Sequence, residues 1–264
     1  MILSPFEKRT LRISAYATLS FGLLTGCSRQ QPPPSAASIP AQQQYFHVDP
    51  KSAATIEGTV QFSGQRPTPK PIDMSDDPAC VQAYKGKPYD EALVIGPTNR
   101  LANVFVYVEK GLEGKNFEVP SAPVVINQTG CWFVPRVVGI QTDQVLQVVN
   151  SDPITHNIHP LAVFNREWNH SQAAGDPPME RRFSKPEIMI PVKCNIHSWM
   201  HAWIGVLPHP YFAVSNNAGT FQIPNLPPGT YTIAAWQEKL GTQRQTITVP
   251  PNGKMNLRFV FRSK

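Results

Sequence analysis

From residue 54 onward, turn residues divide the chain into many short runs of β-forming side chains. Residues 55–62 (TIEGTVQF) alternate between apolar and polar positions, and residues 103–108 (NVFVYV) are rich in β-branched and aromatic side chains. Similar runs occupy residues 124–127, 132–138, 145–150, 188–193, 203–207, 213–215, 220–223, 230–237, 243–249 and 255–261. No window of a dozen residues carries a helical apolar stripe, and 28 prolines oppose an all-helical fold. The pattern predicts an all-β fold built from sandwiches or barrels.

The charge of the chain limits the classes of partner. The 264 residues carry 24 Lys+Arg and 18 Asp+Glu, a formal net charge of +6, and charged residues make up only 16% of the chain. This composition excludes a highly charged disordered protein, and a mean hydropathy of −0.26 excludes a polytopic membrane protein. No cluster of Lys and Arg stands out, so nucleic acid is not an expected partner.

The N-terminus has the pattern of a targeting signal. Lys8, Arg9 and Arg12 precede an apolar stretch, residues 13–24, that is too short to span a bilayer comfortably. The stretch ends in Leu-Thr-Gly before Cys27, which resembles the lipobox of bacterial lipoproteins. The resemblance implies a signal peptide at residues 1–26, lipidation of Cys27 and a place in the cell envelope outside the cytoplasm. In a cell with two membranes, Ser28 favours the outer one. An ordinary secretory peptide and a short membrane anchor are the alternatives.

Residues 27–53 are rich in proline, glutamine, serine and alanine, including three consecutive prolines and three consecutive glutamines. Such a segment buries too little apolar surface to fold by itself. We therefore expect a disordered tether between the lipid anchor and the folded part.

Three cysteines remain after Cys27. In an oxidising compartment two of the three are expected to pair. Cys80 and Cys131 have no histidine near them in the sequence and are the natural disulfide; two separate buried thiols are the alternative. Cys194 is then left for other chemistry.

Cys194 lies in a short segment of soft metal ligands, residues 192–200 (VKCNIHSWM). A thiolate, an imidazole and a thioether there match part of the trigonal His₂Cys set with a weak axial Met that binds copper in blue-copper sites. The second histidine must come from elsewhere, and His156 in residues 149–159 (VNSDPITHNIH) is the candidate. Zinc gains nothing from a thioether, and a Cys–His nucleophile pair does not explain the His156 motif.

These two motifs resemble those of the cupredoxins, most closely amicyanin and plastocyanin. The resemblance implies a Greek-key β-sandwich over residues 54–208 and one type 1 copper that cycles between Cu(I) and Cu(II). Carried over to this sequence, the strong ligands are His156, Cys194 and His197, with Met200 as the weak axial ligand and His201 as its alternative. Asn157 is expected to fix the ligand loops by hydrogen bonding near the sulfur.

The C-terminal segment carries a second resemblance. Residues 219–231 (GTFQIPNLPPGTY) look like the carboxypeptidase regulatory-like, transthyretin-like β-sandwich, which implies a small module over residues 209–264. The apolar residues Phe221, Ile223, Tyr231 and Ile233 alternate along two strands on either side of a Pro-Pro-Gly turn. Such modules usually carry no catalytic residues.

These observations favour a membrane-tethered copper protein that carries single electrons and is not an enzyme. If His197 sits at an apolar surface, as its equivalent does in the family, electrons would pass through its exposed edge to a c-type cytochrome or a dehydrogenase. A copper storage or delivery protein with the same ligands, and a metal-free envelope binding protein, are the alternatives.

Overall fold

The structure, a computed structural model, describes residues 44–263, and these residues are almost entirely β. Within them the only helical elements are the short helix α1 (Pro78–Ala83) and the 3₁₀ turn η1 (Pro97–Asn99). The all-β prediction is confirmed. The predicted signal peptide, the lipidation of Cys27 and most of the tether lie outside the described residues.

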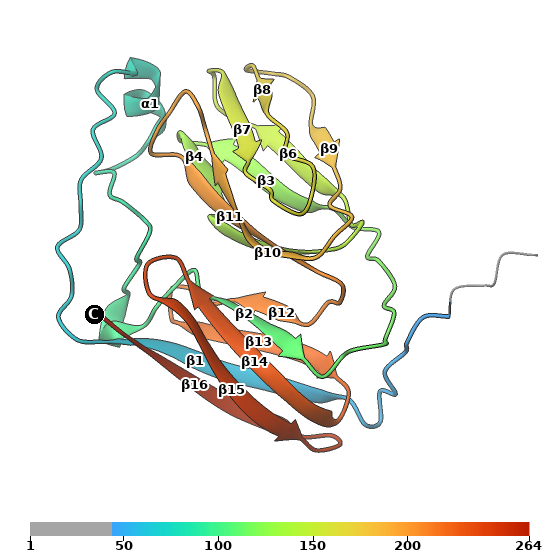
Figure 1. Cartoon of the computed structure of the whole chain (residues 1–264). Helices are drawn as coiled ribbons and strands as arrows, with labels where there is room; N and C mark the ends of the chain where they lie inside the picture. Colours follow the sequence, from blue (N-terminus) through green and yellow to red (C-terminus); the bar gives the residue numbers. More distant parts are fainter. Residues whose placement is uncertain (1–43, 264) are drawn as a thin grey trace, which may run out of the picture. The chain divides into compact units, whose positions relative to one another are not determined.

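Nine consecutive strands form the first sandwich (Figure 1). One sheet has the order β5-β11-β10-β7-β8 and the other has the order β4-β3-β6-β9. The strands are β3 (Val124–Thr129), β4 (Trp132–Val134), β5 (Val137–Gln141), β6 (Leu146–Asn150), β7 (His156–Pro160), β8 (His170–Gln172), β9 (Met179–Arg181), β10 (Glu187–Lys193) and β11 (His201–Leu207). Inward-facing apolar side chains of both sheets share one core, which includes Ile126, Ile140, Val148, Ile158 and Ile204.

Seven strands from both ends of the described chain form the second sandwich (Figure 1). Its sheets have the orders β13-β1-β16 and β12-β2-β14-β15. The strands are β1 (Ala54–Ser63), β2 (Phe105–Lys110), β12 (Phe212–Val214), β13 (Thr220–Leu226), β14 (Gly229–Gln237), β15 (Gly241–Val249) and β16 (Lys254–Arg262). Ile56, Val106, Ile233 and Phe259 are fully buried in its apolar core.

The division between the sandwiches differs from the predicted boundary at residue 208. Strand β1 was expected in the copper domain, but it pairs in antiparallel register with β13 and in parallel register with β16. Strand β2 pairs with β12 and β14. The physical reason is that an alternating strand shows which face is buried but not which strand it pairs with. The first sandwich is therefore inserted between strands of the second.

The predicted tether also ends earlier than residue 53. The Phe46 backbone N–H donates to the Asn116 carbonyl (2.6 Å), and the Phe46 ring packs edge-on against Phe117 with ring centroids 5.7 Å apart. Val48 packs against the same core. The apolar side chains of Phe46 and Val48 therefore pack the last residues of the predicted tether against the second sandwich.

Two glycines leave room for aromatic rings on one face of the sheet that carries β5 and β11. Gly139 and Gly205 are paired across these strands, and both lie under aromatic rings from the second sandwich. A Cβ at Gly139 would lie 2.3 Å from the Phe212 ring, and one at Gly205 would lie 2.6 Å from Phe105. Met189 is also buried in this apolar contact. The glycines are therefore required by close approach of the two sandwiches.

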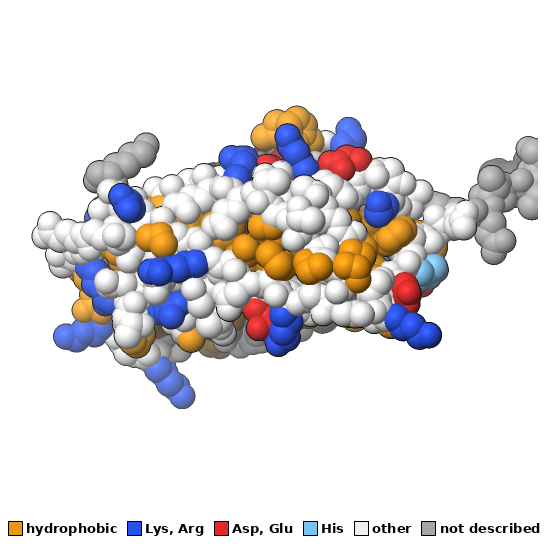
Figure 2. Space-filling model, turned by 90° about the horizontal axis from the view of Figure 1, so that it is seen from below, with side chains coloured by type: hydrophobic (Ala, Val, Ile, Leu, Met, Phe, Trp, Pro, Cys, Tyr) orange, Lys and Arg blue, Asp and Glu red, His pale blue; other side chains and the backbone are white. Residues whose placement is uncertain are grey.

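The face seen from below in Figure 2 has a band of hydrophobic side chains across its middle, with Lys and Arg scattered around it. At the margin of the second core, Leu240, Ile247 and Met255 are only partly buried. Within residues 44–263 no helix has the length and apolarity that crossing a bilayer requires.

Candidate metal centre

The candidate site is built from one strand and one loop of the first sandwich. His156 begins β7, and Cys194 directly follows β10, which pairs with β7. His197 lies in the tight loop between β10 and β11. Two backbone hydrogen bonds close this loop, from Cys194 N–H to the Met200 carbonyl (3.1 Å) and from Met200 N–H to the His197 carbonyl (3.0 Å). The loop thus returns the thiol and the imidazole to the same side.

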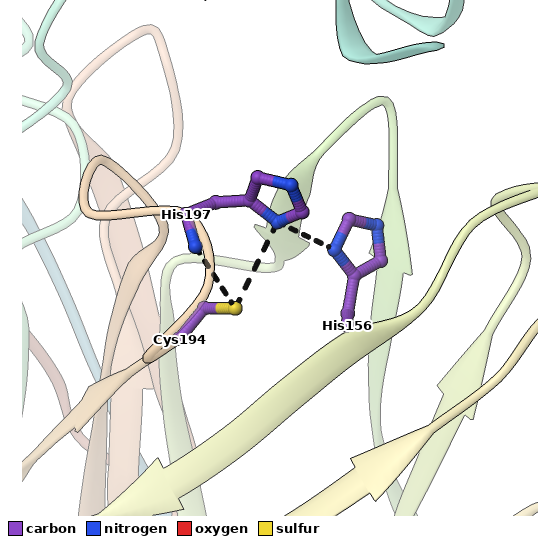
Figure 3. Close-up of side chains that lie close together, drawn as sticks. All are labelled: His156, Cys194 and His197. Atoms are coloured by element: carbon purple, nitrogen blue, oxygen red, sulfur yellow. Dashed lines mark hydrogen bonds between the residues drawn. The ribbon is translucent and has the colours of Figure 1, made fainter. Parts of the chain in front are cut away.

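The three side chains point toward one another in the interior (Figure 3). The Nδ1 atoms of His156 and His197 are 3.0 Å apart, and Cys194 Sγ lies 3.8 Å from His197 Nδ1. Their ligand atoms all lie within 4.8 Å of one another, and the residues are 0%, 3% and 2% exposed for His156, Cys194 and His197. The His197 backbone N–H also donates to Cys194 Sγ (3.4 Å). These separations suit one shared ion, because it can lie about 2.0 Å from each nitrogen and about 2.3 Å from the sulfur.

A carboxylate binds the outer nitrogen of each histidine. His156 Nε2 lies 2.8 Å from Asp152 Oδ2, and His197 Nε2 lies 2.9 Å from Asp77 Oδ2. An Nε2–H that donates to a carboxylate leaves the Nδ1 lone pair free for a metal. Burial lowers the pKa of His156 although Asp152 opposes that shift, and the bond from His197 lowers the pKa of Asp77. The lowered pKa of His156 favours the neutral ring, which is the form in which imidazole binds metals.

Asn157 connects the two ligand segments. Its Oδ1 accepts a hydrogen bond from the Asn195 backbone N–H (2.6 Å), and its Nδ2 donates to Asn169 Oδ1. Asn195 follows Cys194 directly, so this contact ties β7 to the loop beside the sulfur.

The two candidates for the axial ligand differ in burial. Met200 is fully buried in the core of the first sandwich, whereas His201 is exposed at the start of β11. His159 is not part of the cluster, and its Nε2 lies 2.5 Å from Glu167 Oε1. Cys80 and Cys131 form the predicted disulfide, which is confirmed, and Cys194 is the free cysteine of the described residues.

The expected exposed edge of His197 is wrong. His197 is 2% exposed, because Asp77 at the start of α1 covers its Nε2 and Trp199 packs beside its ring with centroids 5.2 Å apart. The sequence reasoning missed Asp77, which lies 120 residues before His197. It also missed Asp152, although a carboxylate four residues before a candidate ligand histidine was a signal that could have been noted.

One family profile matches part of the chain. It is described as fn3_3, polysaccharide lyase family 4, domain II, and it matches residues 209–257, which hold β12 to β15 and the start of β16. The carboxypeptidase regulatory-like resemblance of this segment stays a prediction. A comparison with curated protein sequences found no match.

Several solved structures are similar to part of the chain. A Cu-containing nitrite reductase from Thermus scotoductus is 21% identical over 38% of this chain and 25% of its own length, with a TM-score of 0.31. An amicyanin mutant in the Cu(I) form is 14% identical over 34% of this chain and 86% of its own, with a TM-score of 0.29. A purple cupredoxin from Nitrosopumilus maritimus is 22% identical over 33% and 99%, with a TM-score of 0.27. This chain spans about a quarter of the length of the nitrite reductase.

Proposed function

We propose that this protein binds one copper ion and carries single electrons. The observation that carries the proposal is the convergence of two imidazole Nδ1 atoms and one thiol sulfur, all buried, within 4.8 Å. Imidazole with thiolate is a ligand set that copper and zinc both accept. The thioether of Met200, which is buried and belongs to the same loop as Cys194 and His197, favours copper, and its burial favours Met200 over the exposed His201 as the axial ligand.

The residues of the site hold their positions by contacts that do not depend on the ion. The Cys194–Met200 loop is closed by its own backbone, Asn157 ties it to β7, and each histidine has a carboxylate on its outer nitrogen. When bound, copper supplies one-electron chemistry between Cu(I) and Cu(II). A preformed ligand set suits repeated electron transfer, because the ligands need little rearrangement between the two states.

Trp199 is the side chain that we propose links the site to a redox partner. Its ring lies against His197, its Nε1 donates to the Cys131 carbonyl (3.1 Å), and it lines a surface cavity of about 560 Å³. Since Asp77 covers the edge of His197, electrons from a c-type cytochrome or a dehydrogenase would enter beside Trp199. The protein would act as a carrier rather than as an enzyme, anchored in the cell envelope by a lipid on Cys27.

The test is a titration of residues 28–264 with Cu(II), followed by visible absorption, beside Cys194→Ser. We expect an intense thiolate band that saturates at one copper per chain and is absent from the variant. Equal spectra for the two proteins would contradict the proposal and favour a metal-free binding protein. Rapid loss of copper to a chelator, without a reversible redox wave, would favour storage or delivery. Trp199→Leu should keep the band but slow reduction by a partner.

A further inference from the structure

The carboxylates of Asp77 and Asp152 each accept a hydrogen bond from the backbone of a disulfide cysteine. The Cys131 backbone N–H donates to Asp152 Oδ2 (2.7 Å), the same oxygen that binds His156 Nε2. The Cys80 backbone N–H donates to Asp77 Oδ1 (3.3 Å), and the other oxygen of Asp77 binds His197 Nε2. The backbone N–H of each disulfide cysteine therefore binds a carboxylate that also binds Nε2 of one of the two histidines.

We propose that Asp77 and Asp152 are positioning residues of the metal centre, and that the Cys80–Cys131 disulfide keeps Asp77 in place. This inference rests on the proposed copper function. The connection runs from His156 through Asp152 and Cys131, across the disulfide to Cys80, and through Asp77 to His197. It encloses the outer side of both rings.

The two carboxylates depend on the disulfide to different degrees. The Asp152 side chain is 5% exposed, lies four residues before His156 and also accepts from the Gly130 N–H (2.6 Å). Its position is fixed within the first sandwich. The Asp77 side chain is 31% exposed and belongs to the segment between β1 and β2, which the disulfide bonds to the residue just before β4. Loss of the disulfide should therefore release Asp77 and leave Asp152 in place.

Asp77 also caps α1, since its Oδ1 accepts from the Ala79 N–H (3.0 Å), so the test must separate the two roles. Asp77→Asn keeps one oxygen for the cap, but it places an NH₂ group, which donates and does not accept, where Oδ2 accepts from His197 Nε2–H. Asp77→Ser keeps a capping oxygen on a side chain too short to reach His197, and Asp77→Ala keeps neither. A role limited to capping is therefore restored by Asn and Ser, whereas a positioning role is restored by neither.

The experiment measures Cu(I) affinity of the full chain and its variants against a competing chelator. We expect Asp77→Ala, Asp77→Ser and Asp77→Asn each to lose about 10- to 100-fold in affinity. Nitrogen NMR of the metal-free protein should show a proton on His197 Nε2 in wild type, a mixture of tautomers in Asp77→Ala and Asp77→Ser, and a shift toward a proton on Nδ1 in Asp77→Asn. Affinity near wild type in both Asp77→Asn and Asp77→Ser, or unchanged affinity in Asp77→Ala, overturns the inference.

The role of the disulfide is tested by Cys80→Ser/Cys131→Ser alone and combined with each carboxylate variant. Adding Asp77→Ala should cause no further loss of affinity, because Asp77 is already released, whereas adding Asp152→Ala should cause a further loss. If Asp77→Ala lowers the copper affinity of the disulfide-free variant by as much as it does in the wild type, the proposed role of the disulfide in placing Asp77 is wrong. If wild type binds no copper, the proposed function fails, and the NMR spectra of the metal-free protein still decide whether Asp77 positions His197.

Discussion

The two sandwiches bury histidines in different ways. In the second sandwich, His209 Nε2 lies 3.0 Å from the Val108 carbonyl and its Nδ1 accepts from the Tyr211 N–H (3.3 Å), so main-chain groups bind both nitrogens. In the first sandwich, His156 and His197 each use Nε2 on a carboxylate and turn Nδ1 toward the other ring. A buried histidine with both nitrogens bound by backbone is structural, whereas two that face each other and a thiol are placed for a metal.

The largest expected effect is stabilisation of the first sandwich by copper. At free Cu(I) about 1,000-fold above Kd, binding should raise the free energy of unfolding by about 4 kcal/mol. Denaturant unfolding with and without Cu(I) measures this rise. Cys194→Ser is the control, and an equal rise in that variant would show that copper binds elsewhere.

A pH effect of about 3 kcal/mol is expected in the second sandwich. Burial lowers the pKa of His209 from 6.5 to about 4, so the unfolded chain binds more protons between these values. The contribution of neutral His209 to stability is therefore complete above pH 6.5 and is lost as the pH falls to about 4. The free energy of unfolding of His209→Gln should fall less than that of the wild type as the pH decreases over this range. Parallel curves of unfolding free energy against pH would contradict this interpretation of His209.

One methyl group added at the contact between the two sandwiches should lower the stability of the protein. Gly139→Ala places a Cβ against the Phe212 ring, and overpacking of this kind costs about 1–3 kcal/mol. Thermal unfolding of the variant should show a lower Tm. Gly175→Ala is a comparison at a glycine with open space around it, where the added methyl meets no neighbour and the cost comes from its positive φ alone. An unchanged Tm in Gly139→Ala would mean that the two sandwiches do not pack closely there.

The smallest effect is expected at Asn157. Asn157→Ala leaves the Asn195 N–H without its acceptor and should cost about 1 kcal/mol of stability. The energy of the copper–thiolate absorption band should shift in the same variant, because the loop beside the sulfur loses its tie to β7. A stability loss with no spectral shift would restrict Asn157 to a structural role.

The proximity of Cys194 and His197 could be predicted from sequence because it is local. The two residues lie three positions apart, and a tight loop between two strands brings their side chains together without help from distant parts of the chain. The Cys80–Cys131 disulfide could be predicted because three cysteines remain after Cys27 and only these two have no histidine near them in the sequence. Asp77 could not be found in this way, because nothing in its surroundings marks an aspartate that caps a six-residue helix as a partner of a histidine 120 residues away.

Strand positions were also easier to predict than strand partners. The alternation in residues 55–62 indicates a half-buried strand, yet it holds equally for pairing with any neighbour. The parallel pairing of β1 with β16 joins Thr55 to Lys254, which no local pattern specifies. The apolar Phe46 and Val48 were overlooked for a different reason, since the composition of the segment around them is dominated by polar residues and proline.

The position of β1 between β13 and β16 has a consequence for the order of folding during synthesis. β1 leaves the ribosome before every other strand of the described residues, but its neighbour β16 leaves after all of them. The strands of the first sandwich, in contrast, form one uninterrupted stretch, residues 124–207, and have all their partners much sooner. Domains generally fold as they emerge, and distant pairings form slowly. The sandwich that carries the candidate metal centre should therefore be complete while β1 is still unpaired, and a chain truncated before β16 should keep this sandwich but aggregate through β1.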